Sequence, residues 1–232
     1  DGIPNHNMQD TTNSFATEVS EQTDIYQITA TPEFADSVTE MTVGTEAGIY
    51  LNGVKIDIFA AACLGTDTGD NSGSSIERVG CGANTRSEED EWRFDPMFED
   101  NGFGTDSHNA HTQPTGAYHY HGSPNALFDG DGNSESGTVG FAADGFPIYG
   151  TYISENGVVR EVLSSYRYKD GNRPTIDLGG SSADYSEQPY NGAFRQDYQY
   201  VGGSGDLDEC NGMYRDGSYG YYVTNGFPYI VG

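Results

Sequence analysis

The chain has 232 residues and is strongly acidic, with 36 Asp and Glu residues against 10 Lys and Arg. This balance excludes nucleic acid as a partner, because phosphate contacts require a basic surface. No apolar run approaches the length of a membrane-spanning helix, so we expect no membrane insertion. An acidic surface with only two lysines also favours a marine or halophilic source, because it keeps a protein hydrated in salt.

The composition predicts a mainly β fold. Tyr and Phe, at 17 and 11 residues, supply bulky side chains for a core, and 32 glycines fit short strands joined by tight turns. No segment has the composition of a flexible linker. We therefore predict one domain over residues 1–232, a β-sandwich or jelly-roll-like body with long loops and little helix. Residues 1–24 are loop-like, and we expect an extended N-terminal segment packed on the body.

Strand-like segments follow one another closely along the chain. They cover residues 24–31, 41–43, 48–51, 54–62, 140–143, 146–149, 152–153, 158–163, 197–201, 220–223 and 227–231. Asn52-Gly53 predicts a type I′ hairpin turn, and Glu155-Asn156-Gly157 predicts another hairpin. Residues 87–98 predict a short helix with Ser87 as its N-cap, ended by Pro96.

The cysteines favour a secreted protein. Cys63 and Cys81 bracket a loop rich in Gly, Ser and Asp, and a disulfide between them would stabilise that loop. Cys210 is then left over, although it could replace either partner. The chain opens on Asp1-Gly2-Ile3-Pro4 without a signal peptide, so we expect a processed mature form from the cell envelope, the periplasm or the extracellular medium.

Residues 106–122 hold four of the five histidines in the chain. Tyr118-His119-Tyr120-His121 alternates with the period of a strand, which places both histidines on one face and both tyrosines in the core. Together with His111, the two histidines predict a three-imidazole metal site with an open coordination position. The alternative is a polar strand whose histidines only form hydrogen bonds.

A second segment repeats this pattern without the histidines. Residues 217–222, Gly-Ser-Tyr-Gly-Tyr-Tyr, echo residues 116–121, Gly-Ala-Tyr-His-Tyr-His, and residues 225–228 echo residues 144–147. The tyrosines recur, which indicates a scaffold role for them. The histidines occur in one copy only, which favours a ligand role.

Other residues could complete this site. His6 is a distant fourth ligand candidate, and His108 is either an outer partner or simply exposed. Asp106 and Asp144 could accept hydrogen bonds from ligand imidazoles, and an acid such as Glu209 or Asp208 could shuttle protons. Each aspartate could equally be a turn or cap residue.

A calcium loop is a second candidate site. Asp129, Asp131, Asn133 and Glu135 place oxygen ligands at alternate positions between glycines. The full EF-hand pattern is absent, and a solvated acidic turn is the competing interpretation.

The motifs at residues 116–122 and 142–150 resemble the YHYH-domain family of secreted or envelope proteins of bacteria. Residues 2–6, 109–116, 206–212 and 227–230 are also similar to segments of that family. The resemblance implies His6, His111, His119 and His121 as the working set, and it does not include His108.

We therefore expect a secreted metal-binding protein with a mononuclear copper or zinc site, and calcium as a further candidate ion. One alternative is an enzyme, either a zinc hydrolase or a copper oxidoreductase, acting on a small molecule or an extracellular polymer. Another is a structural domain without catalysis. A closed sphere of four histidines would favour a carrier or structural role, and an open position would favour an enzyme.

Overall fold

The computed structural model describes residues 17–39, 41–60, 62–64, 77–79, 92–101, 104–128, 130–176 and 184–232. Within these ranges the chain forms short β-strands, 3₁₀ turns and no α-helix. The prediction of a mainly β fold with little helix is confirmed. A search of the same ranges for a helix with the length and apolar character of a membrane span found none.

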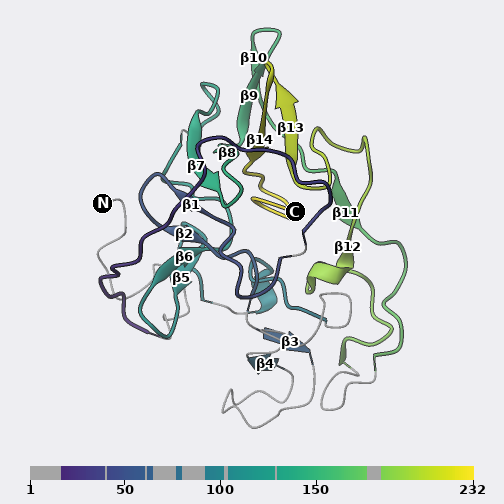
Figure 1. Ribbon diagram of the computed structural model, residues 1–232. Helices are drawn as coiled ribbons and strands as arrows, with labels where there is room; N and C mark the ends of the chain where they lie inside the picture. Colours follow the sequence, from purple (N-terminus) through teal and green to yellow (C-terminus); the bar gives the residue numbers. More distant parts are fainter. Residues whose placement is uncertain are drawn as a thin grey trace.

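Eight strands form one sheet, which is the body of the molecule (Figure 1). Their order across the sheet is β13-β14-β8-β7-β1-β2-β6-β5. Neighbouring strands run antiparallel except in the pairs β2–β6 and β8–β14, which are parallel. The bounds are Gly48–Tyr50 for β1, Lys55–Ile56 for β2, Ala110–Thr112 for β5, Tyr118–Tyr120 for β6, Thr138–Ala142 for β7, Pro147–Tyr149 for β8, Gly212–Arg215 for β13 and Ser218–Tyr222 for β14.

Three two-stranded ribbons lie outside the main sheet (Figure 1). They pair β3 with β4, β9 with β10, and β11 with β12, in the connections between β2 and β5 and between β8 and β13. The 3₁₀ helices η2 and η4 lie in the same two connections. The bounds are Ala62–Leu64 for β3, Glu77–Val79 for β4, Glu99–Asn101 for η2, Tyr152–Glu155 for β9, Val158–Glu161 for β10, Tyr166–Tyr168 for β11, Arg195–Asp197 for η4 and Tyr198–Tyr200 for β12.

The main sheet contains an internal repeat of four strands. Read from either edge inward, the strands follow the same pattern: a hairpin, a parallel neighbour, and the antiparallel partner of that neighbour. We call β1, β2, β5 and β6 the first half-sheet, and β7, β8, β13 and β14 the second half-sheet. They meet where β1 pairs with β7, and the register is symmetric about the pair Ile49 and Phe141. The two half-sheets are thus related by an approximate two-fold axis.

The inner hairpins of the two half-sheets have the same turn. In the first, Gly53 N–H donates to the Tyr50 carbonyl and Val54 N–H to the Asn52 side chain, over 2.9 and 3.1 Å. In the second, Gly145 N–H donates to the Ala142 carbonyl over 2.9 Å, and Phe146 N–H donates to the Asp144 side chain over 3.1 Å. Only the glycines have positive φ, 83° and 93°. The hairpin at Asn52-Gly53 is therefore confirmed, but the predicted type I′ turn is wrong, because that turn needs positive φ at both central residues.

An aspartate-centred loop precedes each outer hairpin. The carboxylate of Asp106 accepts from the N–H groups of His108 and Ala110 and from the Tyr118 hydroxyl. Asp208 repeats this arrangement with Cys210, Gly212 and Tyr219. Asn109 and Asn211, each three residues after the aspartate, have φ values of 64° and 62°. The two loops are therefore equivalent, and they fix the start of β5 and of β13.

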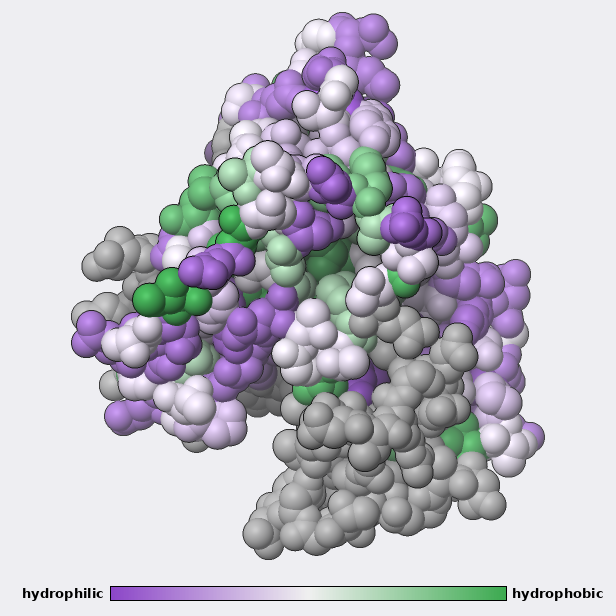
Figure 2. Space-filling model, in the orientation of Figure 1, coloured by the Kyte–Doolittle hydropathy of each residue, from purple (hydrophilic) through white to green (hydrophobic). Residues whose placement is uncertain are grey.

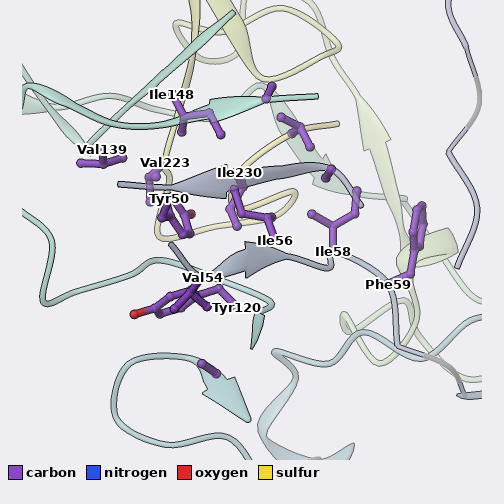
Figure 3. Close-up of a cluster of buried hydrophobic side chains, with 14 of the residues drawn as sticks. Tyr50, Val54, Ile56, Ile58, Phe59, Tyr120, Val139, Ile148, Val223 and Ile230 are labelled. Atoms are coloured by element: carbon purple, nitrogen blue, oxygen red, sulfur yellow. The ribbon is translucent and has the colours of Figure 1, made fainter. Parts of the chain in front are cut away.

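The largest hydrophobic core lies where the half-sheets meet, and both contribute to it (Figure 3). Tyr50, Ile56 and Tyr120 from the first half-sheet lie in one cluster with Ile148 of the second and Ile230 of the C-terminal segment (Figure 3). All five are at most 2 % exposed. Each such side chain contributes about 1.5–3 kcal/mol through its burial. The prediction that Tyr120 is a core residue is confirmed.

The N-terminal segment crosses one face of the sheet as an extended chain (Figure 1). Ser20 N–H donates to the Gly116 carbonyl over 3.0 Å, and the ring of Phe34 lies 4.8 Å from that of Phe146. Residues 24–31 form no strand, so that prediction is wrong. Ile25 is 86 % exposed, whereas Tyr26 and Ile28 are half-buried, and the Tyr26 hydroxyl donates to the Glu46 carboxylate over 3.5 Å. On the face drawn in Figure 2, hydrophilic residues dominate, with hydrophobic residues in a hollow near the centre.

Several other predicted elements differ from the structure. Residues 41–43 and 227–231 form turns, and the described part of the predicted helix, 92–98, contains β-bridges and a turn. Asp95 organises that turn by accepting from the Met97 N–H over 2.8 Å. The hairpin at Asn156-Gly157 is confirmed, with φ values of 52° and 81° that fit a type I′ turn.

Candidate metal centre

The β5–β6 hairpin brings three histidines to one face of the first half-sheet. His111 of β5 is paired directly with His119 of β6. His121 follows two residues after His119 and therefore lies on the same face. Tyr118 and Tyr120 point to the opposite face, where they are 5 % and 1 % exposed. The predicted division between histidine and tyrosine faces is confirmed.

The three imidazoles converge through their Nε2 atoms. Nε2 of His121 lies 3.0 Å from Nε2 of His119 and 3.0 Å from Nε2 of His111. The ring centroids are 4.6–4.8 Å apart and the rings are steeply inclined to one another. Within the described residues, these histidines form the only group of three or more His, Cys, Asp or Glu able to hold a metal ion.

Burial keeps two of these imidazoles neutral. His119 and His121 are each 3 % exposed, whereas His111 is half-buried. Burial lowers the pKa of His119 and His121 well below the usual value, and repulsion between the clustered imidazoles lowers the pKa further. Neutral imidazoles are the form that binds a metal.

The convergence of three nitrogens fits a cation better than a hydrogen-bond network. A neutral imidazole nitrogen carries either one hydrogen or one lone pair, so Nε2 of His121 cannot form two in-line hydrogen bonds. Three lone pairs around a cation remove this conflict. In a tetrahedral zinc site with bonds of 2.0–2.1 Å, the nitrogens are about 3.4 Å apart, close to the two 3.0 Å separations from His121.

A lysine–aspartate pair lies beside the histidines. In the parallel pairing of β2 with β6, Lys55 lies next to His119. Asp57, two residues further along, is on the same face, and its N–H donates to the Tyr120 carbonyl over 3.0 Å. Lys55 Nζ lies 2.9 Å from Asp57 Oδ2, which also accepts from Gln113 Nε2 over 2.6 Å.

These groups are almost as buried as the histidines. The side chains of Lys55 and Asp57 are 11 % and 10 % exposed, and Glu46 lies 3.6 Å from Lys55 on the outer side. Burial raises the pKa of Asp57, and the Lys55 ammonium opposes that rise. The ammonium also helps to lower the pKa of His119 and His121. Lys55 and Asp57 therefore belong to the electrostatic environment of the histidines.

The second half-sheet shows which of these residues the scaffold itself requires. The positions of His111, His119 and His121 are occupied there by Met213, Gly220 and Tyr222. Those of Lys55 and Asp57 are occupied by Pro147 and Tyr149. The aspartate loops and turn residues, by contrast, are shared. The histidines and the Lys55–Asp57 pair are additions to the first half-sheet.

Among the described residues, the predicted outer partners form their hydrogen bonds with groups other than the imidazoles. Asp106 is buried and holds the loop before β5. Asp144 accepts from the Tyr221 hydroxyl over 2.5 Å, in the second half-sheet. Glu209 is exposed, and its backbone carbonyl accepts from the Tyr166 hydroxyl over 2.7 Å. Both aspartates accept hydrogen bonds from backbone N–H groups of their own turns, which is the predicted turn and cap role.

The remaining candidates lie apart from the triad or outside the described residues. His6, Cys81 and Asp129 lie outside the described residues, so the fourth ligand, the Cys63–Cys81 disulfide and the complete calcium loop stay predictions. Cys210 is a free thiol. Asp131, Asn133 and Glu135 are exposed, and Glu135 forms an ion pair with Arg215. His108 lies in the Asp106 loop and is not part of the metal-ligand group.

Sequence reasoning did not identify Lys55, Asp57 and Gln113 as site residues. The alternation Lys55-Ile56-Asp57 was a usable signal, because it places two charged side chains on one face of a strand and an isoleucine on the other. What the sequence does not reveal is the parallel neighbour of that strand, which lies more than 60 residues further along the chain.

Comparison with known proteins gives one family. The family model described as "YHYH protein" matches residues 25–232. Neither the curated proteins nor the solved structures include a match to the chain. The family match covers nearly all of the sequence, including both half-sheets and all three clustered histidines. The chain therefore belongs to the YHYH protein family.

Proposed function

We propose that this protein binds one transition-metal ion, copper or zinc, through His111, His119 and His121. The observation that carries this proposal is the convergence of three Nε2 atoms, with His121 3.0 Å from each of the other two. The absence of histidines from the equivalent positions of the second half-sheet supports it, because the fold does not need them there. The proposal places the protein outside the cytoplasm, as the family resemblance implies.

An all-imidazole set suits copper and zinc better than calcium or magnesium, which take oxygen ligands. Two buried neutral imidazoles and one half-buried imidazole leave access from the side of His111. His6 remains the candidate for a fourth ligand. A fourth histidine would close the site for a carrier or structural role, whereas three histidines would leave a position for water or substrate.

Metal analysis by mass spectrometry tests the proposal. The protein is purified without chelator or nickel resin, alongside His119→Ala, His121→Ala and the matched control His108→Ala. We expect about one equivalent of copper or zinc in the wild type and in His108→Ala, and at least about 100-fold weaker binding in the other two variants. Absence of metal from the wild type, with no uptake on titration, would rule out the proposal.

A metal-dependent enzyme is the second candidate function. The Lys55–Asp57 pair favours it, because a buried charged pair costs stability and is absent from the second half-sheet. In such an enzyme the metal would supply a Lewis acid and lower the pKa of a bound water. Asp57, oriented by Lys55 and Gln113, would offer a carboxylate beside the histidines.

Cobalt substitution distinguishes the open site from the closed one. If the ion has an exchangeable position, adding azide to the Co²⁺ protein shifts its visible absorption bands. If His6 fills that position, the wild type does not respond, and His6→Ala gains the response. No response in either protein would contradict the enzyme and leave the carrier role.

A further inference from the structure

A cleft lies away from the histidines, between the β11–β12 ribbon, the η2 turn and the C-terminal segment. Its volume is about 760 Å³, within the usual range for small-molecule sites. Aromatic side chains from three segments line it: Tyr166, Tyr168, Tyr198, Phe227 and Tyr229. The ribbon belongs to the connection between β8 and β13, and it lies beside the C-terminal segment (Figure 1).

The aromatic rings form one contact network. Tyr198 stacks on Phe227 with centroids 4.1 Å apart and an interplanar angle of 5°. Tyr168 contacts Tyr198 at 5.0 Å, and Tyr166 contacts Phe227 edge-on at 5.2 Å. The Tyr229 hydroxyl donates to the buried Asp95 carboxylate over 2.7 Å. Packing and hydrogen bonds therefore hold the lining in place before any ligand binds.

This network already packs against one cation. The guanidinium of Arg195 lies 4.7 Å from the Phe227 centroid and 4.4 Å from that of Phe59. Aromatic faces attract cations through the negative potential of the ring. Tyr166, Tyr168 and Tyr198 remain partly exposed on the cleft side, and Tyr168 is 51 % exposed. These rings can therefore meet a second cation, one that comes from solvent.

The charges around the cleft also favour a cation. Glu99, Asp100 and Glu161 line it, and all three are exposed. Among the described lining residues, the only basic one is Arg167, whose guanidinium donates to the carbonyls of Ser164, Tyr166 and Ser204. The protein therefore engages three of its five N–H donors. Burial raises the pKa of Tyr166 to about 12, so its ring stays uncharged.

We propose that this cleft binds a small organic cation, one that carries an alkylated or quaternary ammonium group. The aromatic rings would contact the alkylated head through cation–π interactions, and the carboxylates at the rim would supply charge complementarity. A neutral polyol is less favoured because the guanidinium that could donate to it is already bonded to three carbonyls. This site is independent of the histidine site and of its metal.

Choline and its uncharged isostere 3,3-dimethyl-1-butanol test this inference, because they share a shape and differ in charge. Isothermal titration calorimetry is run on the full chain, both chelator-treated and metal-loaded. We expect saturable choline binding that is equal in both preparations, and at least about fivefold weaker binding of the alcohol. Added sodium chloride weakens choline binding, because the carboxylates are exposed.

Two variants locate the site and two serve as controls. Tyr168→Leu and Glu161→Gln should each weaken choline binding at least about twofold. The controls Tyr214→Leu and Glu209→Gln change an exposed tyrosine and an exposed carboxylate outside the cleft lining, and they should leave it unchanged. Equal binding of choline and the alcohol would overturn the proposal. So would no saturation by choline, unchanged affinity in both cleft variants, or binding of cellobiose in place of choline.

Discussion

The two half-sheets share a backbone plan but differ in what they present on one face. Both have the same inner turn, the same aspartate-centred loop and the same tyrosines bonded to it. On the opposite face, the first half-sheet carries three histidines, Lys55 and Asp57, whereas the second carries Met213, Gly220, Tyr222, Pro147 and Tyr149. The second half-sheet thus serves as an internal control for the residues that the fold requires.

The largest expected effects come from one equivalent pair, His121 and Tyr222. Tyr222 is 4 % exposed and packs with Tyr149 at 5.2 Å, so Tyr222→Ala should lower the free energy of unfolding by about 3–5 kcal/mol. The metal affinity of the Tyr222→Ala protein should change less than about twofold, because the substitution alters none of the clustered histidines.

His121→Ala should show the opposite profile, with metal binding lost and a smaller loss of stability in the metal-free protein. Urea unfolding and metal titration of both variants measure the difference. A His121→Ala protein that keeps its metal would show that His121 is not a ligand, and a Tyr222→Ala protein that loses its metal would show that binding also needs the second half-sheet.

The aspartate loops should respond alike. Asp106→Ala and Asp208→Ala each remove a carboxylate that accepts from two backbone N–H groups and a tyrosine hydroxyl. Each variant should lose about 1.5–3 kcal/mol of unfolding free energy, the range for bonds to a charged acceptor. Chemical denaturation checks this, and the internal repeat would be in doubt if only one of the two variants were destabilised.

Lys55 and Asp57 should shift metal affinity in opposite directions. Lys55→Met removes a positive charge near the ion and should tighten binding about three- to tenfold, whereas Asp57→Asn should weaken it by a similar factor. Lys169→Met, at the only other lysine, should have no effect. Competition titrations with a metallochromic chelator measure all three. Shifts in the same direction would mean that these residues act through folding rather than charge.

The smallest effect is a dependence of stability on pH. The pKa of His119 and His121 is lowered in the folded protein, so the unfolded chain binds protons at a higher pH than the folded chain. The metal-free protein should therefore be most stable above about pH 6.5 and should lose stability as the pH falls below it. His119→Gln should reduce this slope. An unchanged slope between pH 6.5 and 5 would show that His119 is not a source of it.

The sequence was informative where structure is local. The alternation of Tyr118, His119, Tyr120 and His121 predicted both faces of β6, and the echo at residues 217–222 indicated that the tyrosines belong to the scaffold. The partnership of β2 with β6 could not be predicted, because parallel pairing joins segments that are distant in the chain. Residues 24–31 looked like a strand because they alternate, but they form none: Ile25 is exposed, and the Tyr26 hydroxyl donates to the Glu46 carboxylate.

The most direct test of the metal site is anomalous diffraction from crystals of the metal-loaded protein, recorded above and below the copper and zinc edges. We expect one anomalous peak, about 2.0–2.1 Å from the Nε2 atoms of His111, His119 and His121, and none beside Met213, Gly220 and Tyr222. A loaded crystal with no peak at the histidines, or with its metal at the acidic loop around Asp131, would contradict the proposed metal site.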